Sequence, residues 1–271
     1  PLMFVVNQLD HEKANYDETI NQVRSYLGEK VTIVQYPINQ GVGFDSVIDL
    51  VLMKQLIFKK GGTPGAAEIK DIPESEKARA EELRLALVEA AATGSEELME
   101  KYFAENELTV DEVRQGIRLG LAARTLFPVM CCSAKESLGV NRLLEFITYN
   151  VPSPNNAFFF RKNTDGVELK YDSSKPTTLF VFKTAIEQHL GEMSFFKIMN
   201  GELVESQDLI NSSTQNKERI SQIFAVEGKN RTKLEKAYAG DIVASIKLKD
   251  VKTNQTLVTQ KNQNERVEPI V

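Results

Sequence analysis

The sequence of 271 residues predicts a two-part protein, in which an α/β unit is followed by an all-β unit. In residues 1–151, strand-like and helix-like segments alternate, which is the pattern of a sheet covered by helices. In residues 152–265, short strand-like segments follow one another between turn residues with almost no helical periodicity, as in a small β-barrel.

The α/β unit begins with a strand, a helix and further strands. The apolar run at 4–6 predicts the first strand, and residues 16–27 repeat apolar side chains at helical spacing. The β-branched stretch 31–36 predicts one strand, and residues 42–60 predict one or two more. The glycine-dense stretch 61–65 that follows predicts a turn.

Three helices, a strand and a last helix complete this unit. The helices are predicted over residues 74–92, 95–103 and 108–124. The third opens with Thr109 and Glu112, a capping box in which each side chain satisfies the other residue's backbone N–H. Residues 126–132 predict a buried strand, and the helix predicted at 140–150 ends at the prolines of 151–154, where we expect the domain boundary.

The all-β unit is predicted from its short strands and its turns. Strands are predicted over 177–186, 193–199, 202–210, 218–226 and 241–248. The dipeptide Asn200-Gly201 lies between two of them and predicts a type I′ hairpin, which needs positive φ at both central positions.

Composition indicates a globular protein of a reducing compartment. Hydrophobic residues make up 42% of the chain and charged residues 26%, and no apolar run is long enough to span a bilayer. The two cysteines, Cys131 and Cys132, are neighbours in an apolar run, which favours small buried core residues over a disulfide or a metal site. We therefore expect a cytoplasmic location, no bound metal and no membrane contact. Pro1 opens almost directly on a core strand, which suggests a piece of a longer protein.

Charge is shared unequally between the two parts. Residues 1–150 carry 16 Lys and Arg against 23 Asp and Glu, whereas the remainder carries 17 against 15. Either this is ordinary variation between domains, or the second part faces a polyanion.

The candidate ligand-binding residues lie at the ends of two predicted strands. Asn7 and Asp10 follow the first strand, at the edge where α/β proteins bind ligands. A carboxylate there can accept from an N–H and an NH₂ lying side by side, the pair that guanine presents on one edge and adenine does not. Alone, this pattern also fits an Asx-turn after a strand. The second strand end, "FPVMCC", runs into Ser133, Ala134 and Lys135, ahead of a glycine loop and a helix.

Together these strand ends resemble guanine-nucleotide-binding domains, which pair Asn-Lys-x-Asp with Ser-Ala-Lys. More specifically, the chain resembles bacterial elongation factor G, from late in its GTP-binding domain to the start of its third domain. The matching segments are "VIDLVLMK", "EELMEKYF", "ELTVDEVRQGIR", "GVNRLLEFITYNVPSP", "FFKIMNGELVESQDLI", "AYAGDIVASIKLKDVKTNQTL" and "EPIV".

The resemblance implies the C-terminal half of a P-loop-type GTP-binding α/β domain with an inserted α+β subdomain, followed by a translation-factor β-barrel. Residues 1–151 would be the guanine-recognition half, with the insertion at about 37–123, residues 152–265 the barrel, and residues 266–271 the start of a third domain.

The resemblance also implies a site, a cofactor and partners. Asn7 and Asp10 would read the base, Ser133 and Ala134 would close over its carbonyl edge, and Gln8 and Lys135 would flank it. The cofactor would be GTP or GDP, with Mg²⁺ held by residues outside this chain. The parent would be a monomer that binds the ribosome, contacts small-subunit ribosomal RNA through the barrel, and promotes movement of tRNA and mRNA during protein biosynthesis.

The sequence also departs from the family. Gln8 stands where the family has a lysine, so the charge and much of the reach are lost. No Gly-Lys-Ser/Thr loop and no Asp-x-x-Gly switch occurs anywhere in the chain, so this chain by itself should not hydrolyse GTP and should bind guanine nucleotides poorly. His11 and His189, the only histidines, are expected in loops without a catalytic role.

Three alternatives stay open. The first is that the parent is a tetracycline-resistance type ribosomal protection protein. The second is a ribosome-binding paralogue without GTP hydrolysis, which Gln8 favours. The third is a nucleotide-independent RNA-binding module. The well-matched insertion favours elongation factor G over the first of these.

Overall fold

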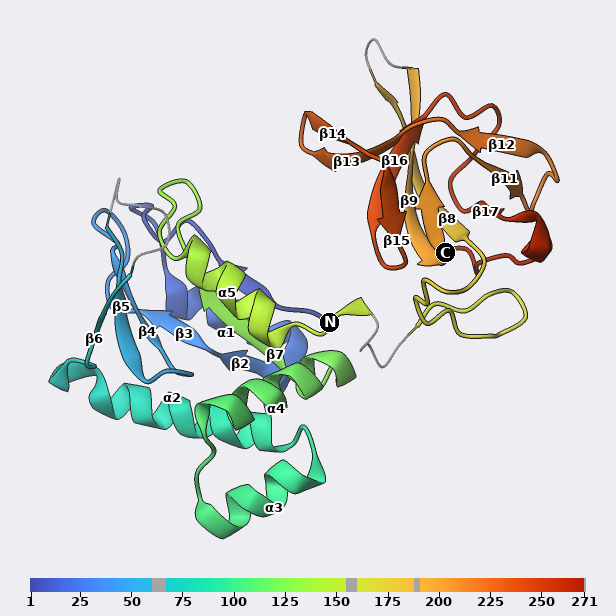
Figure 1. Cartoon of the computed structure of the whole chain (residues 1–271). Coiled ribbons are helices and arrows are strands. Elements are labelled where there is room, and N and C mark those ends of the chain that lie inside the picture. Colours follow the sequence, from blue (N-terminus) through green and yellow to red (C-terminus); the bar gives the residue numbers. More distant parts are fainter. Residues whose placement is uncertain (60–66, 155–159, 188–190, 271) are drawn as a thin grey trace. The chain divides into compact units, whose positions relative to one another are not determined.

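The computed structural model describes residues 1–59, 67–154, 160–187 and 191–270, which fall into two compact units (Figure 1). Unit 1 is Pro1–Pro152 and unit 2 is Ser153–Val271. The glycine-dense stretch 61–65 and His189 lie outside the described residues.

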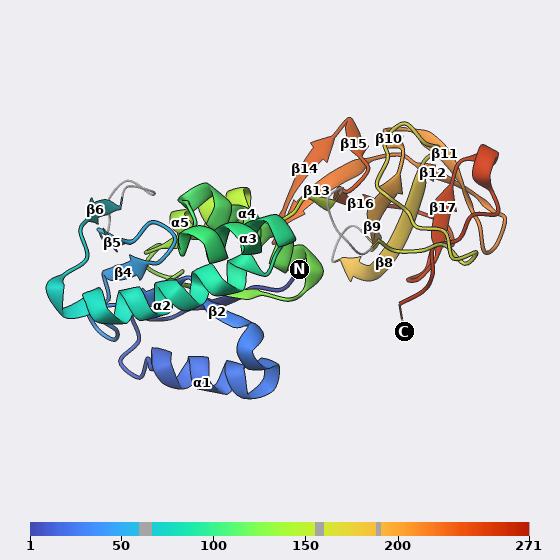
Figure 2. The ribbon, with the colours of Figure 1, turned by 90° about the horizontal axis from the view of Figure 1, so that it is seen from below.

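A parallel sheet of three strands forms the centre of unit 1. Its order is β1 (Phe4–Val6), β7 (Phe127–Cys131) and β2 (Val31–Ile33), and every residue of the central β7 is buried. Helix α1 (Tyr16–Leu27) connects β1 to β2, and Gly28 is its C-cap. Figure 2 shows α1 on one side of β2 and α4 and α5 on the other.

The single strand predicted over 31–36 is wrong, because the chain changes sheets in the middle of it. Val34 leaves the parallel sheet with its N–H still donating to Val129 O at 3.0 Å. The chain then enters an antiparallel sheet in the order β3-β4-β5-β6. Its strands are β3 (Gln35–Pro37), β4 (Ser46–Asp49), β5 (Lys54–Ile57) and β6 (Glu68–Lys70).

The helices of unit 1 confirm the sequence prediction closely. They are α2 (Glu74–Ala92), α3 (Glu96–Glu105), α4 (Val110–Ala123) and α5 (Val140–Asn150). The capping box of Thr109 and Glu112 is present at the start of α4. Helices α2 and α4 approach so closely that a Cβ on Gly116 would lie 2.2 Å from Ala91 O, so this crossing requires glycine.

A buried charged network joins the antiparallel sheet to α5. Asp49, at the end of β4, is fully buried, and its Oδ2 accepts from Gln35 Nε2 and Arg142 Nε, each at 2.8 Å. Burial acts to lower the pKa of Arg142, but Asp49 and Glu145 outweigh it and the pKa is raised, so the guanidinium stays charged. The network fixes α5, which follows the second polar strand end, against the antiparallel sheet.

Unit 2 is a curled antiparallel β domain. Its main sheet has the order β12-β11-β17-β8-β9-β16-β13-β14, and β10 pairs with β15 beside it. The strands are β8 (Thr178–Glu187), β9 (Gly191–Asn200), β10 (Glu202–Val204), β11 (Gln207–Asn211), β12 (Lys217–Ile220), β13 (Ile223–Glu227), β14 (Asn230–Leu234), β15 (Lys236–Tyr238), β16 (Ile242–Ile246) and β17 (Thr256–Val258). The core beneath them is aliphatic, with Phe196 as its largest fully buried side chain.

The hairpin predicted at Asn200-Gly201 is wrong. Strands β9 and β10 pair with other strands, and Asn200 remains in extended backbone at the end of β9. Gly201 does adopt positive φ (75°), but for a different reason: its backbone lies so close to Thr177 that a Cβ would come within 2.6 Å. The dipeptide is thus held by the loop before β8, whose Asp172 O accepts from Gly201 N at 2.9 Å.

Two long predicted strands are each divided in the structure. The stretch 202–210 breaks between β10 and β11, where Ser206 has φ 64°, and 218–226 breaks between β12 and β13. The short halves pair with different neighbours, which curls the sheet. In the part of the chain that the structure describes, no helix is long and apolar enough to cross a membrane.

Candidate nucleotide-base site

The two polar strand ends predicted from sequence meet at one edge of the parallel sheet. Strand β1 pairs in parallel with β7 in the register Val6 to Cys131, so the residues that follow each strand leave the sheet side by side. This pairing continues past the strands, because Cys132 N donates to Val6 O at 3.0 Å. The edge is the carboxyl end of both strands, where ligands bind in parallel α/β folds.

A hydrogen bond joins the acidic residue of one strand end to the serine of the other. Ser133 Oγ donates to Asp10 Oδ1 at 2.6 Å, across 123 residues of sequence. Ser133 is fully buried and Asp10 is half-buried. The hydroxyl is held in turn by the loop, since Glu136 N donates to it at 3.4 Å. The carboxylate is thereby held in one orientation.

A second bond joins the asparagine to the alanine. Ala134 N donates to Asn7 Oδ1 at 2.9 Å, and the thiol of Cys132 lies 3.5 Å from the same oxygen. Burial raises the pKa of the Cys132 thiol, so it stays protonated and able to donate. Because Asn7 Oδ1 is engaged on this side, its Nδ2 faces away from the loop as a donor.

Backbone turns present these groups on one side. Gln8 adopts positive φ (61°), which is unusual for a side chain with a Cβ, and its carbonyl accepts from His11 N at 3.0 Å. Leu9, between the polar positions, is buried as an anchor, and its carbonyl accepts from Gly41 N at 2.8 Å. On the other strand end, Ser133 and Leu138 bond reciprocally to close the loop.

The structure thus brings together four of the six predicted residues, Asn7, Asp10, Ser133 and Ala134, by direct bonds. Gln8 and Lys135 are exposed at the margin and take no part in these bonds. Sequence reasoning did not find the roles of Cys132 and Leu9, whose only signal was their place inside each polar motif. His11 is an exposed loop residue whose Nδ1 accepts from Lys13 N at 3.1 Å.

The fit to a guanine base is good at the carboxylate and altered at the alanine. Asp10 offers a carboxylate whose Oδ1 is oriented by Ser133, and a carboxylate is the kind of acceptor that a side-by-side donor pair requires. The Ala134 N–H, which the resemblance assigns to the guanine carbonyl, donates here to Asn7, so a bound base would have to share it or displace it. The described residues contain no group of three or more His, Cys, Asp or Glu side chains placed to hold a metal ion.

Several basic residues of unit 2 are engaged by neighbours. Arg219 lies 3.1 Å from Asp208, Lys233 lies 2.7 Å from Glu205, and Lys236 lies 2.5 Å from Glu202. Lys183 and Lys197 lie over the rings of Phe195 and Tyr171. These pairs lower the positive field that the sequence composition suggested for this unit.

A known protein family matches part of unit 2. Residues 176–260 match the family model of elongation factor G domain 2. The fold of nearly the whole chain is also found in the crystal structure of ttk003000868 from Thermus thermophilus, with a TM-score of 0.77 and 24% sequence identity. The match covers 96% of this chain and 36% of that protein, so this chain spans about a third of its length.

An α/β unit is thus followed by a curled β domain, of which residues 176–260 match elongation factor G domain 2. Over residues 176–260 the chain is similar to elongation factor G, and over nearly its whole length it shares the fold of the Thermus thermophilus protein.

Proposed function

We propose that unit 1 carries the guanine-recognition edge of a GTP-binding domain and that unit 2 contacts small-subunit ribosomal RNA. The parent protein would be a monomeric, cytoplasmic GTPase that binds the ribosome and promotes GTP-dependent movement of tRNA and mRNA. The observation that carries this proposal is the pair of bonds between the strand ends, Ser133 Oγ to Asp10 at 2.6 Å and Ala134 N to Asn7 at 2.9 Å. The second support is the elongation factor G domain 2 match of residues 176–260.

Base selection follows from the chemistry of Asp10. Its carboxylate accepts from guanine N1–H and the exocyclic NH₂ together, and the Ser133 hydroxyl orients it for both. Adenine has no such donor pair and would leave the carboxylate short of partners, at a cost of about 1–3 kcal/mol. Asn7 contributes an amide donor to another edge of the base while fixing the Ala134 loop.

The phosphates of GTP or GDP and the Mg²⁺ ion would be held outside this chain. The sequence contains neither the phosphate-binding loop nor the switch that hydrolysis requires, so the chain would supply base recognition alone. Gln8 and Lys135, exposed beside the site, would flank the base and ribose. Weak, base-specific binding is therefore expected of the isolated chain.

A change of base specificity tests the guanine site. Xanthine carries a carbonyl where guanine carries the exocyclic NH₂, so Asp10→Asn should offer an amide donor to that carbonyl. We expect this variant to bind xanthosine diphosphate better than GDP, and the native chain to show the opposite order, each by roughly tenfold, which corresponds to about 1.4 kcal/mol. Nuclear magnetic resonance titration suits such weak binding. Equal affinities of both chains for both nucleotides would contradict the site.

Sedimentation with small ribosomal subunits tests the second part of the proposal. Contacts to RNA phosphates make binding fall steeply as salt rises. We expect the chain to sediment with the subunits at low salt and to be released between about 50 and 200 mM salt. Binding that is absent at low salt, or unaffected by salt, would refute the RNA contact. Replacing Lys229, an exposed residue between β13 and β14, with Glu should weaken the binding to the subunits at low salt.

A further inference from the structure

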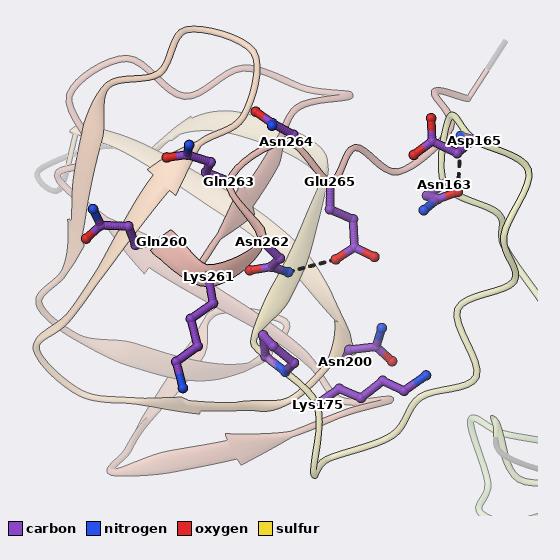
Figure 3. Close-up of a pocket in the computed structure, with 11 residues that line it drawn as sticks. Asn163, Asp165, Lys175, Asn200, Gln260, Lys261, Asn262, Gln263, Asn264 and Glu265 are labelled. Atoms are coloured by element: carbon purple, nitrogen blue, oxygen red, sulfur yellow. Dashed lines mark hydrogen bonds between the residues drawn. The ribbon is translucent and has the colours of Figure 1, made fainter.

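A polar pocket in unit 2 lies outside the site described above. It has a volume of about 450 Å³, within the range of small-molecule sites, and lies between the loop before β8, the end of β9 and the segment after β17. Asparagine, lysine and acidic side chains make up most of its lining, and no aromatic residue is among the described residues that line it (Figure 3).

Two asparagines in this pocket are nine-tenths buried, and each has its oxygen occupied. Asn163 is 9% exposed, and its Oδ1 accepts from Asp165 N at 3.1 Å and Val167 N at 2.9 Å. Asn200 is 4% exposed, and its Oδ1 accepts from Asp172 N at 3.2 Å. These backbone donors fix which end of each amide is which.

The amide NH₂ groups of both residues therefore face the pocket as donors. Among the described residues, neither Nδ2 has a hydrogen-bond acceptor in the protein. Figure 3 shows the two amides and the carboxylate of Glu265 around one open space. Neither Nδ2 is among the buried side-chain atoms that lack a partner, so both amide donors are open to water or to a ligand that enters the pocket.

Glu265 adds an acceptor in a fixed position. Its Oε2 accepts from Thr178 Oγ1 at 2.6 Å and from Asn262 Nδ2 at 2.7 Å. Asn262 is itself held by Thr259, whose hydroxyl donates to it at 2.7 Å. This network leaves the carboxylate rigid at the pocket wall, with its second oxygen available to a donor.

The chemistry of the lining selects the class of ligand. The pocket carries two lysines and two acids, so its charge is balanced and it is no trap for a free anion. Its inner groups are two amide donors and one carboxylate acceptor that line the same pocket, so they can be matched by a ligand with two acceptors and one donor. A hydroxyl supplies both functions at one atom, and two neighbouring hydroxyls satisfy all three groups. Without an aromatic surface, the pocket gives a nucleobase nothing to stack on.

We propose that this pocket binds the vicinal hydroxyls of a ribose. The hydroxyls would accept from Asn163 and Asn200 and donate to Glu265, with the base left outside. Lys175, whose ammonium lies beyond Asn200 in Figure 3, would meet the attached phosphate, whereas Lys261 points away. The same chemistry is offered by a free ribonucleotide and by the 3′-terminal nucleotide of an RNA. This inference concerns unit 2 alone and does not depend on the guanine site.

The test is a titration of the 271-residue chain with uridine 5′-monophosphate, a nucleotide that the guanine site does not recognise. We expect a dissociation constant of about 1 mM or tighter, with shifts in the side-chain amide signals of Asn163 and Asn200. The 2′-deoxy nucleotide lacks one hydroxyl and should bind roughly fivefold to tenfold more weakly. Equal binding of the two nucleotides, or no binding at about 10 mM, would overturn the proposal.

Isosteric variants assign the binding to these residues. Asn163→Asp and Asn200→Asp keep the oxygen that accepts from the backbone, so the fold is preserved, but replace the donor with an acceptor beside Glu265. Each variant should weaken the binding of uridine monophosphate by roughly fivefold or more. Asn21→Asp makes the same charge change on an exposed face of α1 and should leave the affinity unaltered. Affinity unchanged in both pocket variants would place the nucleotide elsewhere and refute the site.

Two further arms separate the sources and the role of Lys175. Lys175→Gln should weaken the binding of uridine monophosphate but not of uridine; an equal loss for both would remove the phosphate contact from the proposal. An oligouridylate with a 3′-terminal diol is compared with the same oligomer ending in a dideoxynucleotide. Tighter binding of the first oligomer than of uridine monophosphate assigns an RNA end, and binding of the mononucleotide alone assigns a free nucleotide.

Discussion

The buried carboxylate of Asp49 gives the most direct test of how unit 1 is held together. Its two oxygens face two pairs of donors, since Oδ2 accepts from Gln35 and Arg142, and Oδ1 accepts from Val51 N at 3.1 Å and Leu52 N at 3.0 Å. In Asp49→Asn, one oxygen becomes an NH₂ group. Whichever way the amide turns, one pair of donors then faces another donor.

The cost follows from burial. Two buried donors lose their acceptor at about 1–3 kcal/mol each. Arg142, only 7% exposed, loses one of its two carboxylate partners, and removing one member of a buried ion pair costs about 3–5 kcal/mol. The two values describe the same loss, so we expect the free energy of unfolding of unit 1 to fall by about 3–5 kcal/mol.

Far-UV circular dichroism during urea unfolding measures this fall, because the α-helices of the described residues, α1 to α5, all belong to unit 1. The matched control is Asp111→Asn, since Asp111 is 91% exposed and its pair with Arg114 should contribute under about 1 kcal/mol. A loss of less than about 1 kcal/mol in Asp49→Asn would refute the reasoning, because it would mean that the network relaxes or admits water at no cost.

Further predictions concern single side chains. The Lys101 ammonium and the cap of α4 lower the pKa of Glu112 to about 2, below its value of 4.5 in the unfolded chain. The stability this contributes is therefore present above pH 4.5 and is lost as pH falls through 2. Glu112→Gln should cost about 1 kcal/mol at neutral pH, and this difference should shrink steadily in urea titrations as pH is lowered from 4.5 through 2. Gly201→Ala, at positive φ and without room for a Cβ, should destabilise unit 2 by roughly 1–3 kcal/mol in thermal unfolding, and unchanged stability would contradict the close approach of the chain there. Burial raises the pKa of Cys131 and Cys132, so neither thiol should react with a disulfide reagent at pH 8 until the chain is denatured, and rapid labelling of the native chain would argue against their burial.

Local patterns were enough to predict the helices. The capping box at Thr109 and the C-cap at Gly28, whose φ is 66°, act within one turn of chain, so their effect can be predicted from neighbouring residues. The same holds for β7, which is apolar throughout because both its faces are covered. Both polar strand ends were likewise visible as motifs, and the parallel sheet then placed them side by side.

Long-range pairing accounts for what the local patterns missed. Nothing near Val34 indicates that the strand will change sheets there, since the reason is the position of Val129, far along the chain. Asn200-Gly201 has the local signature of a hairpin, but the loop at Asp172 and Thr177 holds it in another conformation. The Ala134 N–H was expected to face a ligand, and only the packed strand ends show that it donates to Asn7.

Residue types and short spacings alone predict an α/β unit followed by an all-β unit, the helices and the two polar strand ends, and show that the sequence has no Gly-Lys-Ser/Thr loop. Packing in three dimensions establishes which donors are already engaged, how Asp49 and Arg142 join the antiparallel sheet to α5, and that Asn163 and Asn200 share one pocket with Glu265. Such features arise where residues distant in sequence are brought into contact by burial of the core, and no local pattern encodes that contact.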